Sequence, residues 1–207
     1  VRDQLMRIGK LGNPPVQPTV GCPSPWDYRN HVQFHLTEDG RLGDVSARGA
    51  EVIPISECHL PEAPINDLWP HLDFEPDTEI ERVSLRTGDD LMLVLESESP
   101  AAPELELEAG ISVVHLYEDN PVVMAGDGTL RMRVLDRDFQ VSAASFFQVN
   151  TLMAEKMVEH VLSKLPAEMD IVLDLYCGVG LFSAFLAPRC QRLIGIESSA
   201  SACEDFA

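Results

Sequence analysis

The segment of residues 171–197 constrains the fold of this chain more than any other. Residues 171–175 (IVLDL) form a short apolar run that is typical of a buried strand, and Gly178 begins a turn and a helix that extend to about Ala187. A second strand-like run follows at residues 192–196. Strand, helix and strand over this distance predict a βαβ unit, because parallel neighbours need a crossover connection. The sequence therefore predicts the beginning of a parallel, Rossmann-like sheet.

A glycine turn and a distant carboxylate make this unit a candidate ligand site. Asp174 lies on the first strand, and Gly178 and Gly180 allow a tight turn and a close approach of a ligand to the backbone. Glu197 ends the second strand, near the spacing at which an acid accepts hydrogen bonds from ribose hydroxyls. Nicotinamide dinucleotides use the same geometry, but Ser183 replaces the third glycine of their Gly-x-Gly-x-x-Gly pattern. The aspartate and the cysteine before the first glycine favour S-adenosylmethionine as the ligand.

The chain before this unit is rich in predicted strands. Residues 28–36 alternate between polar and apolar side chains, as a half-buried strand does, and further strand-like runs follow, separated by turns. The period changes at residues 150–165, which predict a helix. We therefore expect an α/β protein with a β-rich, mixed α+β central domain at residues 1–145 and the first βαβ unit of a Rossmann-like domain at residues 146–207. Two parallel strands do not bury their own faces, so we expect the second domain to be incomplete and the chain to be truncated at both ends.

Net charge and composition limit the partners of the chain. The formal net charge of −19 argues against generic nucleic-acid binding, because phosphate contacts need a basic surface. An RNA contact would therefore have to be local. There is no apolar run of the roughly 18 residues that span a membrane and no signal pattern, so we expect a cytoplasmic protein with no membrane or obligate protein partner. The five cysteines form no CxxC pair and are expected to be reduced.

Three stretches carry a more specific signal. They are Ser24-Pro-Trp-Asp-Tyr-Arg-Asn-His31, Ser145-Phe-Phe-Gln-Val-Asn150 and Asp174-Leu-Tyr-Cys-Gly-Val-Gly180. In this order and separation they resemble the family of RNA uracil-5-methyltransferases, and the resemblance covers essentially the whole chain. The second stretch is the specific one, because the glycine loop is common to many methyltransferases. The resemblance implies that Gln148, Tyr176 and Glu197 bind S-adenosylmethionine.

The resemblance also implies an RNA substrate and places three residues near it. Phe146 matches a family position near the target base, where it would hold an unstacked uridine or fill the gap that the base leaves. Core packing is the alternative, since adjacent phenylalanines are usually buried. Arg29 and His31 lie on the polar face of the predicted strand, and we expect them to contact RNA phosphate or sugar.

Cys58 is a candidate ligand of an iron–sulfur cluster. In family members with a [4Fe-4S] cluster, three cysteines lie before the region where this chain begins, and the fourth has a context like Ile55-Ser-Glu-Cys-His-Leu60. The first three are not in these 207 residues, so this chain alone would not complete a cluster, and packing is the alternative role. The transfer RNA branch generally lacks the cluster, so Cys58 favours 23S ribosomal RNA over tRNA as the substrate.

The family mechanism needs two groups that we do not find in this sequence. Carbon 5 of uracil is a weak nucleophile, so a cysteine thiolate adds to carbon 6, the methyl group is transferred, and a base removes the carbon 5 proton. Both groups lie in later motifs of the family, and we do not expect Cys177 or Cys203 to replace the nucleophile. The chain as given should therefore be inactive. Two alternatives remain: a non-catalytic RNA-binding or assembly module with a vestigial donor site, and a nicotinamide-dependent oxidoreductase.

Overall fold

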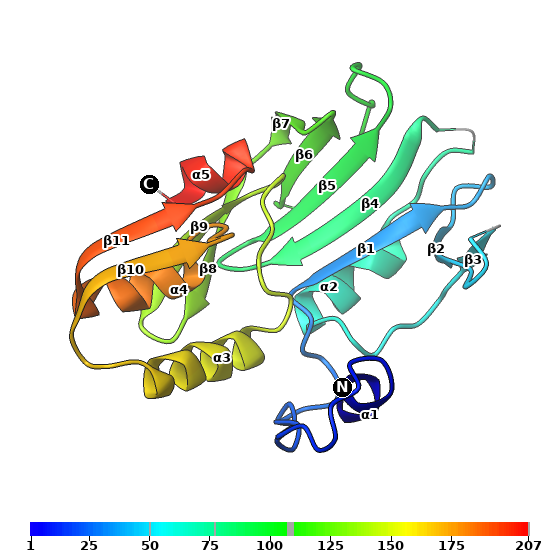
Figure 1. The fold of residues 1–207 in the computed structure, drawn as a ribbon. Helices are drawn as coiled ribbons and strands as arrows, with labels where there is room; N and C mark the ends of the chain where they lie inside the picture. The colour runs from blue at the N-terminus through cyan, green and yellow to red at the C-terminus, as the bar shows by residue number, and fades with distance from the viewer. Residues whose placement is uncertain (50, 77, 107–109, 207) are drawn as a thin grey trace.

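The computed structural model describes all residues except 50, 77, 107–109 and 207 (Figure 1). Along the chain the elements are α1 (Arg2–Arg7), β1 (His31–Leu36), β2 (Leu42–Val45), β3 (Val52–Pro54), α2 (Ala63–Leu68), η1 (Trp69–His71), β4 (Ile80–Thr87), β5 (Leu91–Ser97), β6 (Ser112–Tyr117), β7 (Asn120–Ala125), β8 (Thr129–Val134), β9 (Arg137–Ser142), α3 (Thr151–Lys164), β10 (Met169–Leu175), α4 (Leu181–Leu186), η2 (Ala187–Arg189), β11 (Cys190–Ile196) and α5 (Ala200–Phe206). The predicted mixed α/β class is confirmed.

A seven-stranded sheet with the order β3-β2-β1-β4-β5-β6-β7 forms the centre of the N-terminal part. Neighbouring strands are antiparallel, except for the parallel pair β5 and β6. Strand β1 shows the predicted alternation: Val32 and Phe34 are buried, whereas Gln33 between them is exposed. It pairs with β4 in a register that sets His31 opposite Arg86.

Each face of this sheet has its own hydrophobic core. On one face α2 and η1 supply Ile65 and Trp69, and the Trp69 ring lies 5.2 Å from that of Phe34. On the other face Met92 and Val94 of β5 pack with Leu130 of β8. The two-stranded hairpin β8–β9 thus covers the second face instead of extending the sheet.

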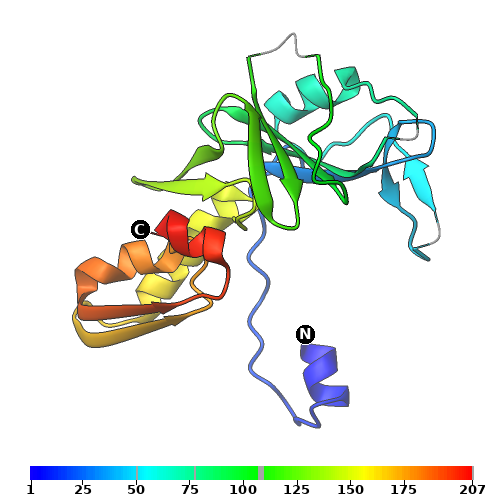
Figure 2. The same cartoon turned by 90° about the horizontal axis from the view of Figure 1, so that it is seen from above.

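The hairpin β8–β9 also belongs to a third core. Met132, Val134 and Phe139 pack with residues of α3, α4 and α5. Figure 2 shows the hairpin between the large sheet and the C-terminal helices. It therefore shares buried surface with both parts of the molecule, and the domain boundary between residues 145 and 146 stays a prediction.

The C-terminal part contains the predicted βαβ unit. Strands β10 and β11 are parallel, with Val172 opposite Leu193, and α4 lies in the connection between them. Helix α4 packs against one face of the pair. The other face exposes Ile171, Leu173 and Leu175 by 65%, 55% and 53%, with no covering element among the described residues.

Helix α1 lies apart from the rest of the molecule. None of its residues is buried, and an extended segment separates it from the sheet (Figure 2). In the part of the chain that the structure describes, no helix has the length and the apolar character needed to cross a membrane.

Candidate functional site

Backbone hydrogen bonds hold the loop after β10 against the end of β11. The N–H groups of Tyr176 and Cys177 donate to the carbonyl oxygen of Ile196, at 2.8 and 3.2 Å. Tyr176 has a φ of +60°, which is uncommon for a residue with a side chain and is a form of strain that clusters at functional turns. Its side chain is 89% exposed, so the ring is free to cover a ligand beside the loop.

The Glu197 carboxylate joins the end of β11 to the glycine loop. Its Oε2 accepts a hydrogen bond from the Gly178 N–H at 2.8 Å, and its Oε1 accepts bonds from the N–H groups of Ser198 and Ser199 at 2.7 and 2.9 Å. The bonds from Ser199, Gly178 and Ser198 lower the pKa of Glu197 below its usual value. Because bonds to the charged form favour that form, Glu197 is an anion at neutral pH.

Ser183 occupies the position of the third glycine in the Gly-x-Gly-x-x-Gly pattern. Its side chain is buried, and its Oγ donates to Oδ2 of Asp174 at 2.6 Å. The hydroxyl thereby ties helix α4 to strand β10 and orients the predicted donor-binding aspartate. A glycine at this position would remove that bond.

The two glycines of the loop have different surroundings. A Cβ added at Gly178 would meet nothing within 4 Å among the described residues, so this position is open to a ligand. A Cβ at Gly180 would lie 2.4 Å from Cδ2 of Phe206 on α5, and Gly180 has a φ of +85°. A side chain at this position would therefore displace the Phe206 ring, whichever ligand binds.

A cavity of about 290 Å³ lies between the glycine loop, the end of β11 and α5. Cys177, Gly178, Glu197 and Phe206 are among the residues that line it. Burial, followed by the charges of Asp174 and Glu197, raises the pKa of the Cys177 thiol. A protonated thiol is a poor nucleophile, which agrees with the expectation that Cys177 is not the catalytic cysteine.

The two phenylalanines before α3 have opposite environments. Phe147 is buried, and its ring lies 5.8 Å from that of Phe139 in the core. Phe146 is 68% exposed. The core-packing alternative therefore describes Phe147, whereas Phe146 is available to a partner. Gln148 is half-buried in the same segment and does not line the cavity beside Glu197.

The polar face of β1 is less open than its sequence pattern indicates. Arg29 and His31 are half-buried, and among the described residues Nε of Arg29 and Nε2 of His31 are buried without a hydrogen-bond partner. Burial, followed by the charges of Arg86 and Arg29, lowers the pKa of His31 to about 3. The imidazole is therefore neutral at pH 7, and the predicted RNA contact of His31 would not be one of opposite charges.

Cys58 is half-buried and packs against the core between the sheet and α2. No group of three or more potential metal ligands occurs among the described residues. The residues present therefore do not by themselves form a cluster site, and the role of Cys58 as a ligand stays a prediction.

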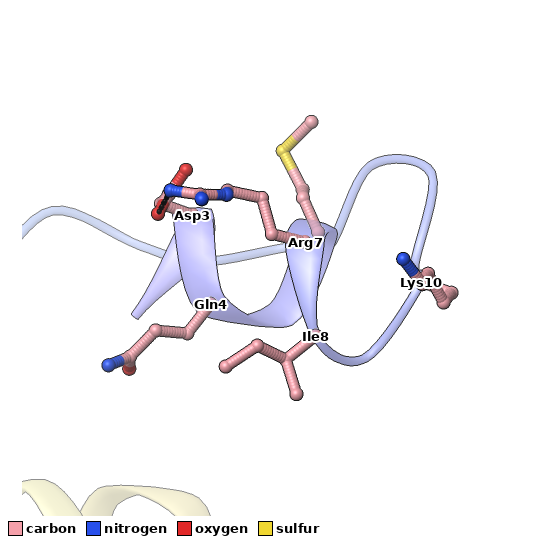
Figure 3. Close-up of a pocket in the computed structure, with 6 residues that line it drawn as sticks. Asp3, Gln4, Arg7, Ile8 and Lys10 are labelled. Atoms are coloured by element: carbon pink, nitrogen blue, oxygen red, sulfur yellow. Dashed lines mark hydrogen bonds and ion pairs between the residues drawn. The ribbon is translucent and has the colours of Figure 1, made fainter.

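A larger hollow of about 590 Å³ lies along α1 (Figure 3). Its lining consists of residues of α1 and the turn after it, including the ion-paired Asp3 and Arg7. Among the described residues, only α1 and the turn after it line this hollow, so it is not a candidate ligand site.

The residues that connect the site to the large sheet and to the hairpin β8–β9 are Asn30, Arg86 and Asp205, and none of them was predicted from the sequence. Asn30 lies inside the first stretch of the resemblance, so its position was a signal. Arg86 is an ordinary polar residue of a predicted strand, and Asp205 is an ordinary acidic residue of a helix. No sequence motif marks either residue as part of a site. Their partners are far away in the sequence, and only the tertiary fold shows them.

A βαβ unit with a glycine loop, and with an acid closing its second strand, defines the Rossmann-like class of fold, which methyltransferases and nicotinamide-dependent enzymes share. The comparisons agree with this class. The crystal structure of Pyrococcus abyssi tRNA (uracil-54, C5)-methyltransferase in complex with S-adenosyl-L-homocysteine is similar to this chain, with a TM-score of 0.70. The identity is 23%, over 99% of this chain and 56% of that one, so the similarity concerns the fold.

Similarity to known sequences supports the predicted resemblance. Residues 113–206 match the model of the tRNA (Uracil-5-)-methyltransferase family. An uncharacterized RNA methyltransferase of Streptomyces avermitilis is 32% identical over 86% of this chain and 43% of its own length. One of Streptomyces coelicolor is 32% identical over 99% of this chain and 49% of its own length. The predicted resemblance to RNA uracil-5-methyltransferases is confirmed over residues 113–206, which include two of the three sequence stretches, and the chain spans about half the length of these relatives.

Proposed function

We propose that this chain binds S-adenosylmethionine at the carboxyl ends of β10 and β11, for methylation of carbon 5 of a uridine in RNA. The observation that carries the proposal is the Glu197 carboxylate, which is bonded to the Gly178 N–H beside an open cavity. The family match supplies the reaction class. The methylation itself is proposed for a protein of the relatives' length that includes this chain.

The residues around the cavity fit the parts of this donor. Oε2 of Glu197 accepts one protein hydrogen bond, and a carboxylate oxygen has two lone pairs, so it retains an acceptor site for a ribose hydroxyl. The exposed ring of Tyr176 can cover the donor, and Gly178 leaves room for it. Asp174 is held by Ser183. Gln148 lies outside the lining of this cavity, and its assignment to the donor rests on the resemblance. S-adenosylmethionine would supply an electrophilic methyl group.

Because the chain has a net charge of −19, we expect RNA to contact it at a local site and not over a broad surface. We assign the contact with the unstacked base to Phe146, because its ring is exposed and its neighbour Phe147 is anchored in the core. Arg29 would contact the RNA backbone as a cation and His31 as a neutral group. These three residues come from the N-terminal stretch of the resemblance and from the segment before α3.

We propose 23S ribosomal RNA as the substrate and Cys58 as a ligand of a [4Fe-4S] cluster. Both proposals are supported by the sequence position of Cys58. Transfer RNA is the alternative, and the name of the matching family favours it.

Release of tritium from RNA labelled at carbon 5 of uridine tests the reaction class. A protein of the relatives' length that includes this chain would be incubated with S-adenosylmethionine and either 23S ribosomal RNA or tRNA. We expect tritium in water from ribosomal RNA and not from tRNA. Release from tRNA alone would overturn the ribosomal assignment, and release from neither would overturn carbon 5 methylation.

A further inference from the structure

Arg86 holds the beginning of the segment that carries Phe146 and Gln148. Its Nη1 donates to the carbonyl oxygens of Ser142 and Ser145, at 3.1 and 2.8 Å. Ser145 directly precedes Phe146, so this contact fixes the backbone from which the exposed ring projects.

Asn30 holds the end of the same segment. Its Nδ2 donates to the carbonyl oxygen of Gln148 at 3.0 Å, and its N–H donates to that of Val149 at 3.0 Å. The side chain of Asn30 is 3% exposed. Its own carbonyl oxygen accepts a bond from the Thr87 N–H at 2.9 Å, so Asn30, which directly precedes β1, lies next to the pair of His31 and Arg86.

A further contact connects the segment held by Arg86 to the cavity beside Glu197. The N–H and Oγ of Ser142 donate to the carboxylate of Asp205 on α5, at 2.8 and 2.5 Å. The next residue, Phe206, packs on Gly180 and lines the cavity. Arg86 therefore acts on one residue, Ser142, that also anchors a wall of the proposed donor site.

The contacts of Arg86 and Asn30 act mainly on the main chain of the segment that carries Phe146 and Gln148. Arg86 donates to the main-chain carbonyl groups of Ser142, the last residue of β9, and of Ser145. Asn30 donates to the carbonyl group of Gln148 and to Oγ1 of Thr151, at 3.0 Å each, and none of these bonds uses the side chains of Phe146 and Gln148. Arg86 makes no ion pair among the described residues, and its Nε is buried without a partner. Burying a guanidinium is costly, and here the cost is offset by the bonds to Ser142 and Ser145 and by the charges of Glu96 and Asp205.

We propose that Arg86 is a positioning residue: from the large sheet it sets both the pose of residues 145–149 and the α5 wall of the donor cavity. The proposal rests on the proposed function. It implies that Ser142 connects the large sheet, beside which the proposed RNA contacts lie, to the proposed donor site.

Calorimetric titration with S-adenosylhomocysteine, together with amide hydrogen exchange, tests the role in the full chain. We expect Arg86→Met to weaken S-adenosylhomocysteine binding by about tenfold, as for the loss of a charge-assisted hydrogen bond, and to increase exchange in residues 143–149 while exchange in β10 stays unchanged. Arg86→Lys should recover part of the affinity, because an ammonium can still donate to one carbonyl oxygen. The matched control is Arg82→Met on the same strand, where the arginine is exposed and paired with Glu96, and it should leave affinity and exchange unchanged.

The possible results show whether Arg86 is a positioning residue. Unchanged affinity in folded Arg86→Met, or an equal loss in Arg82→Met, would overturn it. If Arg86→Met does not fold, Arg86→Lys decides: lower affinity with intact exchange in β10 supports positioning, and wild-type affinity refutes it. Failure of the wild-type chain to bind the ligand would overturn the proposed function, and with it this inference.

Discussion

At the scale of single residues, the site depends on charges and hydrogen bonds that neighbouring groups impose. Glu197 keeps its charge because three backbone N–H groups donate to it. Its stabilising contribution is therefore fully present above the ordinary pKa of 4.5 and is lost as the pH falls through the lowered value. His31 shows the opposite effect, because burial disfavours its charged form.

His31 should make the stability of the chain depend on pH in mildly acidic solution. Its pKa is about 3 when folded and 6.5 ordinarily, so between these values the unfolded chain binds more protons. The free energy of unfolding should therefore rise with pH across this window and level off above 6.5 for this group. Urea unfolding of wild type and His31→Gln across the window checks this: the variant should show a shallower slope, with non-titrating Gln33→Ala as the control. Equal slopes in wild type and His31→Gln would refute the burial of a neutral imidazole.

At the scale of elements, the βαβ unit depends on how α5 packs over the glycine loop. Phe206 of α5 lies so close to Gly180 that a Cβ at Gly180 would force the ring to move. Asp205 ties the helix to Ser142 at the end of β9. The glycine loop is therefore supported from the hairpin as well as from β10.

Gly180→Ala should be much more destabilising than Gly178→Ala. Both positions have a positive φ, which costs a residue with a Cβ about 1–2 kcal/mol. At Gly180 the clash with Phe206 adds roughly 1–3 kcal/mol of overpacking. Thermal unfolding of the two variants measures the difference. Equal losses of stability would show that Phe206 does not pack on Gly180 in solution.

At the scale of the whole molecule, local patterns predicted most elements but not how they assemble. The alternation around Val32 and the change of period at residue 150 reflect burial and turn chemistry, which are local. The packing of hairpin β8–β9 on two cores, and the bonds of Arg86, depend on partners distant in sequence. The motif predicted Glu197 and the glycine loop as site residues, and the fold shows that they are in contact. The burial of His31 and the packing of Phe206 on Gly180 depend on distant residues and could not be predicted from the motif.

The central claim, a methyl-donor site at the ends of β10 and β11, is tested most directly by calorimetric titration of the wild-type chain with S-adenosylhomocysteine and, separately, with NAD⁺. Wild type should bind S-adenosylhomocysteine in preference to NAD⁺. Glu197→Gln should weaken that binding by roughly tenfold or more, because the charged acceptor is lost, whereas Glu204→Gln on the exposed face of α5 should not. Preference for NAD⁺, or binding that is unaffected by Glu197→Gln, would contradict the assignment of this site.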